Sequence, residues 1–163
     1  MSDDTRSSGS GDAQTLKLDC FLPYRLSVLS NAVSRKIAEM YERDFEISIW
    51  QWRIIAVLGE SDGLTATQVA TQTLMDKPAV SRATASLLER GLISRKSDTS
   101  DRRKAALRLT KKGRTIYDAI IPRALAYERA LLSGLSTEDA ETLHRLLTRL
   151  SHIASPDRDL WSD

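Results

Sequence analysis

The chain has almost no cysteine and no long apolar segment. Cys20 is the single cysteine among 163 residues, so no disulfide can form within one chain. This composition is typical of a reducing compartment, and we expect a cytoplasmic protein. No segment reaches the roughly 18 consecutive apolar residues of a membrane span, and the polar, acidic amino terminus is unlike a secretory signal. We therefore expect no membrane partner.

Motifs that carry catalysis or bind metals are missing as well. The sequence contains no GxSxG, HExxH, glycine-rich phosphate loop or paired-cysteine motif, so we expect neither enzyme activity nor a cofactor. The two histidines, His144 and His152, are not spaced as the i, i+4 pair that a metal favours on a helix. We accordingly expect no metal site.

Positive charge is concentrated in one part of the chain. The formal net charge is only +2, yet the segment Lys77–Arg114 carries 12 of the 24 basic residues and 3 of the 22 acidic ones. Such segregation gathers positive potential on one surface, as binding to a polyanion requires. The distribution therefore indicates a nucleic acid as partner.

Long amphipathic helices are expected at both ends of the chain. Near the amino terminus, apolar residues recur at helical spacing from Leu18 to Arg43, and Pro23 fits only the first turn. Near the carboxyl terminus, a long helix from Thr110 should kink at Pro122, and a last helix follows, capped by Ser136. Their apolar faces are wider than a small monomer covers, which favours subunit pairing.

Shorter helices and a hairpin are expected in between. Ser48 with Gln51, and Thr65 with Gln68, form capping boxes that begin two helices. Asp76 caps a third helix, which tolerates proline in its first turn. Over 105–109 apolar and polar residues alternate as in a strand, and the preceding SDTSD turn completes a β-hairpin.

These elements predict a mainly α fold with a small β-hairpin wing, that is, a winged helix-turn-helix with N- and C-terminal dimerisation helices. We expect a disordered tail over 1–17, an N-terminal dimerisation helix over 18–47, a DNA-binding region over 48–110, C-terminal dimerisation helices over 111–154 and a second tail over 155–163.

The third short helix has one apolar face for a core and one polar face for a groove. The polar face carries small side chains apart from Arg82, so its backbone could approach base edges in a major groove about 12 Å wide. We expect Ser81 and Arg82 to contact bases and Lys77 to contact phosphate. The candidate DNA-binding residues on this helix are Lys77, Pro78, Ser81, Arg82 and Ser86.

The hairpin carries a second group of cations, namely Arg95, Arg102, Arg103 and Lys104. Arg102 and Arg103 follow the turn directly, and an arginine at such a tip can enter a narrow minor groove while its neighbours bind phosphate. We expect Asp101 to anchor the tip rather than to face DNA, since phosphate would repel a carboxylate.

Several segments resemble the MarR family of bacterial transcriptional regulators. DKPAVSRATASLLERGLISR is similar to the family's recognition helix and first wing strand, and DRRKAALRLTKKG is similar to its wing signature, whose paired Asp and Arg fall on Asp101 and Arg103. LPYRLSVLSNAVSR and WQWRIIAVLGE are similar to a proteobacterial branch of the family. The resemblance covers roughly Leu18 to Ile153.

The resemblance implies a homodimer whose first and last helices intertwine and which binds a palindromic operator in double-stranded DNA. It also implies a repressor that a small, often aromatic, effector releases from DNA. Tyr24, Arg25, Trp50 and Trp52 lie where the family usually builds its effector pocket, and Arg25 could pair with a carboxylate.

Two other functions stay open. Cys20, in CFLPY, is placed like the reactive cysteine of the family's peroxide-sensing branch, so a single-cysteine peroxide-sensing repressor is one alternative. We expect instead an unreactive, partly buried thiol, because free cysteine commonly packs as a small apolar residue. The other alternative is a winged-helix module for protein association, since fold alone does not fix function.

Arg103→Ala is expected to weaken binding to many DNA sequences by a similar factor, because it removes one contact to phosphate or the minor groove. The slope of log K against log salt should fall by about one unit. Equilibrium binding to several unrelated duplexes over a salt series measures both effects. A loss of affinity with an unchanged slope would contradict the assignment of the wing.

Overall fold

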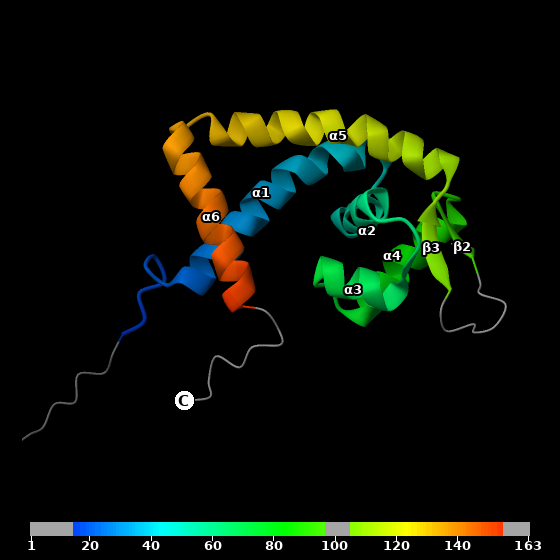
Figure 1. The fold of residues 1–163 in the computed structure, drawn as a ribbon, viewed down its shortest axis with the longest axis horizontal. Helices are drawn as coiled ribbons and strands as arrows, with labels where there is room; N and C mark the ends of the chain where they lie inside the picture. The colour runs from blue at the N-terminus through cyan, green and yellow to red at the C-terminus, as the bar shows by residue number, and fades with distance from the viewer. Residues whose placement is uncertain (1–14, 97–104, 155–163) are drawn as a thin grey trace, which may run out of the picture.

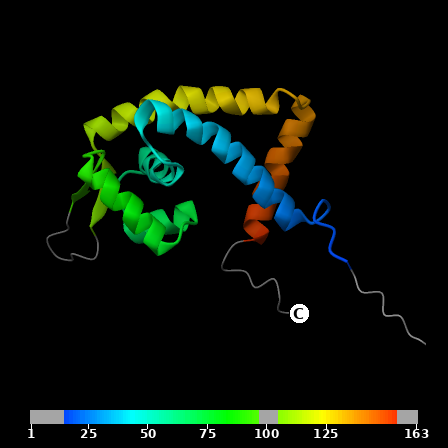
Figure 2. The same ribbon diagram turned by 180° about the vertical axis from the view of Figure 1, so that it is seen from behind.

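The chain folds into a lobe around a small sheet and an arm of long helices beside it (Figure 1). The computed structural model describes residues 15–96 and 105–154. The lobe, called the winged lobe below, consists of α2 (Ile49–Glu60), β1 (Leu64–Thr65), α3 (Ala66–Thr73), α4 (Lys77–Glu89), β2 (Ile93–Lys96) and β3 (Ala106–Leu109). The arm consists of α1 (Leu22–Phe45), α5 (Lys111–Leu132) and α6 (Thr137–Ile153). Seen from behind, α6 turns back sharply from the end of α5 (Figure 2).

Local sequence signals set the starts of the short helices, as predicted. The Ser48 hydroxyl accepts a hydrogen bond from the Gln51 amide nitrogen, and the Gln51 side chain accepts one from the Ser48 amide at 2.9 Å. Thr65 and Gln68 form the same capping box at α3. Each box satisfies two amide groups that lack partners inside the helix.

The apolar pattern extends from Leu18, but regular helix begins at Leu22, with Pro23 in the first turn as predicted. A turn precedes it in which the Cys20 amide donates to the Lys17 carbonyl at 3.1 Å. Pro23 in the first turn of α1 accounts for this later start, because its ring excludes it from a helix interior. In the arm, α5 continues without interruption through Pro122.

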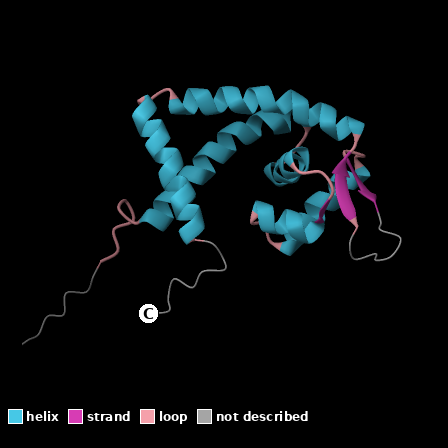
Figure 3. Ribbon diagram, in the orientation of Figure 1, coloured by secondary structure: helices cyan, strands magenta, loops and turns pink. Residues whose placement is uncertain are grey.

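The predicted hairpin is present and belongs to a three-stranded antiparallel sheet of order β1-β3-β2 (Figure 3). Ile93 pairs with Leu109 and Arg95 with Leu107, which fixes the register of the hairpin. The sequence did not predict β1, where Leu64 pairs with Leu107 from the other side. Two residues are too few to show the alternation that marks a strand.

The apolar core lies in the winged lobe and where the arm meets it. Ile54, Leu58, Leu87 and Leu107 are fully buried there. From the arm, Tyr41 is buried and its ring stacks on Trp52 of α2 with centroids 5.3 Å apart. By contrast, α6 has no buried residue. The far part of the arm is therefore uncovered in a single chain, although none of the described helices is long and apolar enough to cross a membrane.

Gly113→Ala is expected to destabilise the fold by about 1–3 kcal/mol, because a Cβ there would overlap the carbonyl oxygen of Leu92 and force the start of α5 away from the sheet. Gly134→Ala is the matched control, since open space surrounds that residue in the turn before α6, and it should change stability by less than about 0.5 kcal/mol. Urea unfolding at equal protein concentration compares them. Equal midpoints would contradict the close approach of α5 to Leu92.

Candidate nucleic-acid interface

Helix α4 presents the two faces that the sequence predicted. Val80, Ala83, Thr84 and Leu87 are buried, and α4 packs against α2 through this side. The opposite side is exposed and carries Pro78, Ser81, Arg82, Ala85 and Glu89, with Lys77 exposed at the first turn. Apart from Arg82 and Glu89 these outward side chains are small, so another molecule could approach the backbone of the helix closely.

The amino end of α4 is held by Asp76. Its carboxylate accepts a hydrogen bond from the Ala79 amide at 2.6 Å, which caps the helix. Lys77 and Pro78 occupy the exposed first turn next to this cap. The capped end of α4 is thereby fixed, with a cation beside it that could contact phosphate.

Ser86 lies at the edge of the outward face rather than at its centre. It is half-buried, and its hydroxyl accepts a hydrogen bond from the side-chain amide of Gln51 at 2.9 Å. The sequence placed Ser86 on the exposed face but did not reveal this bond, because Gln51 is 35 residues away. The hydroxyl of Ser86 therefore links α4 to the start of α2.

The wing adds exposed cations beside α4. Arg95 and Lys96 are exposed at the end of β2. Arg108 of β3 pairs with Asp62, so part of its charge is balanced within the lobe. Seen from opposite sides, α3, α4 and the open end of the hairpin all lie on the side of the lobe that faces away from α5 (Figure 1, Figure 2). The remaining predicted wing residues, Asp101, Arg102, Arg103 and Lys104, lie outside the described residues.

A cavity of about 450 Å³ opens between α1, α2 and α5, where the arm meets the winged lobe. Trp52 lines it together with Tyr41, Arg53, Tyr127 and Glu128. Burial raises the pKa of Tyr41 to about 12, so its phenol is neutral at physiological pH. The lining residues come from three separate helices, which is why sequence spacing alone did not group them.

The structure brings only part of the predicted effector set to this cavity. Trp52 lines it, but Tyr24 and Arg25 are exposed on the first turn of α1. Trp50 is exposed and does not line the cavity, although the guanidinium of Arg53, which does, lies 5.4 Å from its ring centroid. In a single chain these four residues therefore do not form one pocket.

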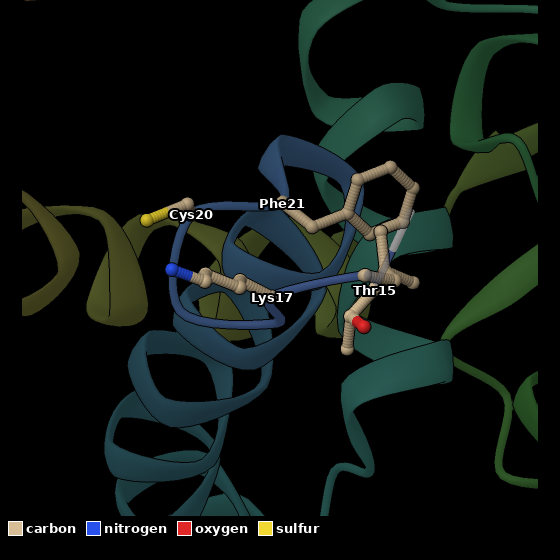
Figure 4. Close-up of a pocket in the computed structure, with 5 residues that line it drawn as sticks. Thr15, Lys17, Cys20 and Phe21 are labelled. Atoms are coloured by element: carbon tan, nitrogen blue, oxygen red, sulfur yellow. The ribbon is translucent and has the colours of Figure 1, made fainter. Parts of the chain in front are cut away.

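Cys20 is exposed in the turn before α1, so the expectation of a partly buried thiol is wrong for the single chain. Figure 4 shows Cys20 and Lys17 pointing to one side of this turn and Phe21 to the other. The fold accounts for this exposure because the turn precedes the helix and no element of the core covers it. Within the described ranges, no group of three or more His, Cys, Asp or Glu side chains could hold a metal ion.

A model of the MarR family matches residues 45–104, which span the end of α1, the helix-turn-helix and the start of the wing. This segment of the chain therefore matches the MarR family. The two faces of α4 and the antiparallel wing are thus features of a MarR-family winged helix, in agreement with the resemblance of the sequence.

Solved structures of this family match most of the chain. A MarR/EmrR family transcriptional regulator from Acinetobacter sp. ADP1 is 27% identical, with a TM-score of 0.77 over 84% of this chain and 96% of that one. The MarR family regulator SPO1453 from Silicibacter pomeroyi DSS-3 is 26% identical, with a TM-score of 0.76 over 86% and 100%. MepR of S. aureus, crystallised as a complex with DNA, is 27% identical, with a TM-score of 0.72 over 80% and 96%.

Asp76→Ala is expected to lower the free energy of unfolding by about 1 kcal/mol, because α4 loses the acceptor that caps its first turn. Asp76→Asn keeps an N-cap oxygen and should stay within a few tenths of a kcal/mol of the parent. Urea unfolding of the DNA-free protein measures both. An equal loss in the two variants would assign the effect to charge rather than to capping.

Proposed function

We propose that this MarR-family protein is a sequence-specific, DNA-binding transcriptional regulator that places α4 in the major groove. The observation that carries the proposal is the outward face of α4, where Ser81 and Arg82 are exposed among small side chains beside the exposed Arg95 of β2. A helix with such a face can approach base edges, while neighbouring cations bind phosphate. The likeness to MepR, which was crystallised as a complex with DNA, supports DNA binding by this chain.

We further propose that two copies pair through the arm. No residue of α6 is buried in the single chain, and large apolar side chains remain exposed on all three arm helices. A second copy would remove this apolar surface from water, which is the main favourable term in stable association. The exposed side chains are Leu22, Leu26, Val28 and Leu29 of α1, Leu125 and Leu131 of α5, and Leu143, Leu146, Leu147 and Ile153 of α6.

A symmetric dimer makes the operator palindromic. Two copies of α4 related by a twofold axis would contact two half-sites of opposite orientation, separated by about one helical turn of DNA, roughly 34–36 Å. The spacing of the two helices is then part of what the protein recognises.

The cavity between arm and winged lobe is the proposed effector site. A ligand there would touch α1 and α5 of the arm as well as α2 of the lobe. Trp52 and Tyr127 offer aromatic surface and Arg53 a cation, which fits a small aromatic acid. If the ligand prefers the arrangement that does not bind DNA, a coupling of about 1–3 kcal/mol suffices for release, and the protein acts as a repressor.

Selection of binding sites from random duplexes by the purified protein tests the proposed function. We expect a palindrome with two half-sites about one helical turn apart, bound far more tightly than a scrambled duplex. Addition of small aromatic carboxylic acids to the selected complex then tests release. Failure to enrich any sequence would contradict sequence-specific binding.

Arg82→Ala is expected to change the preferred base at one position of each half-site, with a loss of discrimination of about 1–3 kcal/mol there. Arg95→Ala is the matched comparison, since it removes an exposed cation of the wing and should weaken all duplexes alike with a lower salt slope. Competition binding against single-base variants of the selected site separates the two effects. Identical profiles for both variants would exclude Arg82 from base recognition.

A further inference from the structure

Arg90, the residue that directly follows α4, reaches the end of α1. Its guanidinium donates one hydrogen bond to the Glu46 carbonyl at 2.6 Å and another to the Phe45 carbonyl at 2.9 Å. These carbonyls belong to the last turn of α1 and its cap, where the helix leaves acceptors without partners and its dipole is negative. Arg90 therefore stabilises the end of an arm helix although it belongs to the winged lobe.

The same residue is linked to the second long arm helix. The ammonium group of Lys112, in the first turn of α5, donates to the Arg90 carbonyl at 3.1 Å. Next to it, the Thr110 hydroxyl donates to the Gly91 carbonyl at 2.8 Å. Both long helices of the arm thus meet α4 at its carboxyl end, and Arg90 takes part in both contacts.

A second polar link runs between α4 and the same region. Gln51 donates to Ser86 of α4, and its carbonyl oxygen accepts from the Ser48 amide in the turn that follows α1. The carboxyl half of α4 is therefore joined to the α1–α2 turn at two points, Ser86 and Arg90.

The other buried side chains of α4 are mostly apolar, and apolar and polar contacts constrain the geometry of two helices differently. Apolar burial holds two helices together but is not directional. A planar guanidinium that donates to two carbonyls at once fixes both distance and angle. Arg90 therefore adds a directional contact between α4 and the arm to the non-directional packing of the buried side chains.

Arg90 is also poorly placed to contact DNA itself. It lies eight residues after Arg82, about 12 Å further along the helix axis at 1.5 Å per residue. Its side chain is only 29% exposed, and two of its donors are directed at carbonyls of α1. These contacts fit an indirect role, in which Arg90 positions α4, better than a direct contact of Arg90 with phosphate.

We propose that Arg90 is a positioning residue that sets the orientation of α4 relative to α1 and α5, and hence the spacing of the two DNA-contacting helices in the dimer. The inference rests on the proposed function, because spacing has meaning only for a dimer bound to two half-sites. It adds a determinant of half-site spacing that does not touch DNA.

The test uses duplexes that carry the selected half-sites with the central spacer shortened or lengthened by one to three base pairs. The full-length protein is compared with Arg90→Met, which keeps the length of the side chain but removes its donors, and Arg90→Lys, which keeps the charge but removes the planar fork. Glu46→Gln is the matched control, because it removes the carboxylate 3.9 Å from Arg90 and leaves the carbonyl acceptors in place. Arg82→Ala serves as the reference for loss of a base contact.

For both Arg90 variants we expect affinity for the best duplex to fall about tenfold or more, in line with the loss of charge-assisted hydrogen bonds. The preference for one spacer length should broaden or shift, while the salt slope and the affinity for a scrambled duplex stay unchanged. Arg82→Ala should lose affinity at every spacer length but keep the same optimum, and Glu46→Gln should match the parent.

Several results would overturn the inference. An unchanged spacer optimum in Arg90→Met and Arg90→Lys, with folding verified by circular dichroism, would reduce Arg90 to a stabilising residue at most. Normal binding by Arg90→Lys together with a salt slope lowered by about one unit in Arg90→Met would make it a phosphate contact. If the parent protein itself selects no duplex, the proposed function fails first, and the two failures are therefore distinguishable.

Discussion

The packing of α4 on α2 is the interaction on which the candidate interface depends. Val80 and Leu87 are buried against the lobe, so the side of α4 that carries Ser81 and Arg82 must face outward. Successive residues are about 100° apart around a helix, and a rotation by one position would bring Arg82 toward the core. An unpaired charge in that core would be costly, so apolar packing alone determines which side chains can meet another molecule.

The arm is subject to a different constraint, because most of its apolar surface is not buried within one chain. Tyr41 and Ile120 join the core where the arm meets the lobe, whereas α6 contributes no buried residue at all. The core of the winged lobe includes these arm residues, while the far half of the arm stays available for the proposed pairing. The two long helices thus contact the lobe at one end and present uncovered apolar surface at the other.

The sequence was most informative where the signal is local. The capping boxes at Ser48 and Thr65 and the two faces of α4 each involve residues within a few turns, and all appear as predicted. Features that need a distant partner were missed. The strand β1 exists only through its pairing with β3, and Arg90 has carbonyl groups as its partners, which any sequence would supply.

The effector residues fall between these cases. All four were assigned by resemblance to the family, and of these Trp52 lines the cavity, whereas Tyr24, Arg25 and Trp50 do not line it in the single chain. The exposed position of Cys20 likewise depends on what lies around the turn before α1 rather than on its neighbours in sequence. Resemblance predicted the region of these residues, whereas their surroundings are set by tertiary structure.

The cavity and the polar links of α4 meet in the first turns of α2. Trp52 and Arg53 line the cavity, and the residue before them, Gln51, donates to Ser86 of α4. Since a helix moves as a rigid element over one or two turns, a displacement of Trp52 by a ligand would also displace the donor that holds α4. The α1–α2 turn, where Arg90 makes its two hydrogen bonds, lies at the start of the same segment. Binding in the proposed effector cavity and the direction of α4 would therefore be coupled through the first turns of α2.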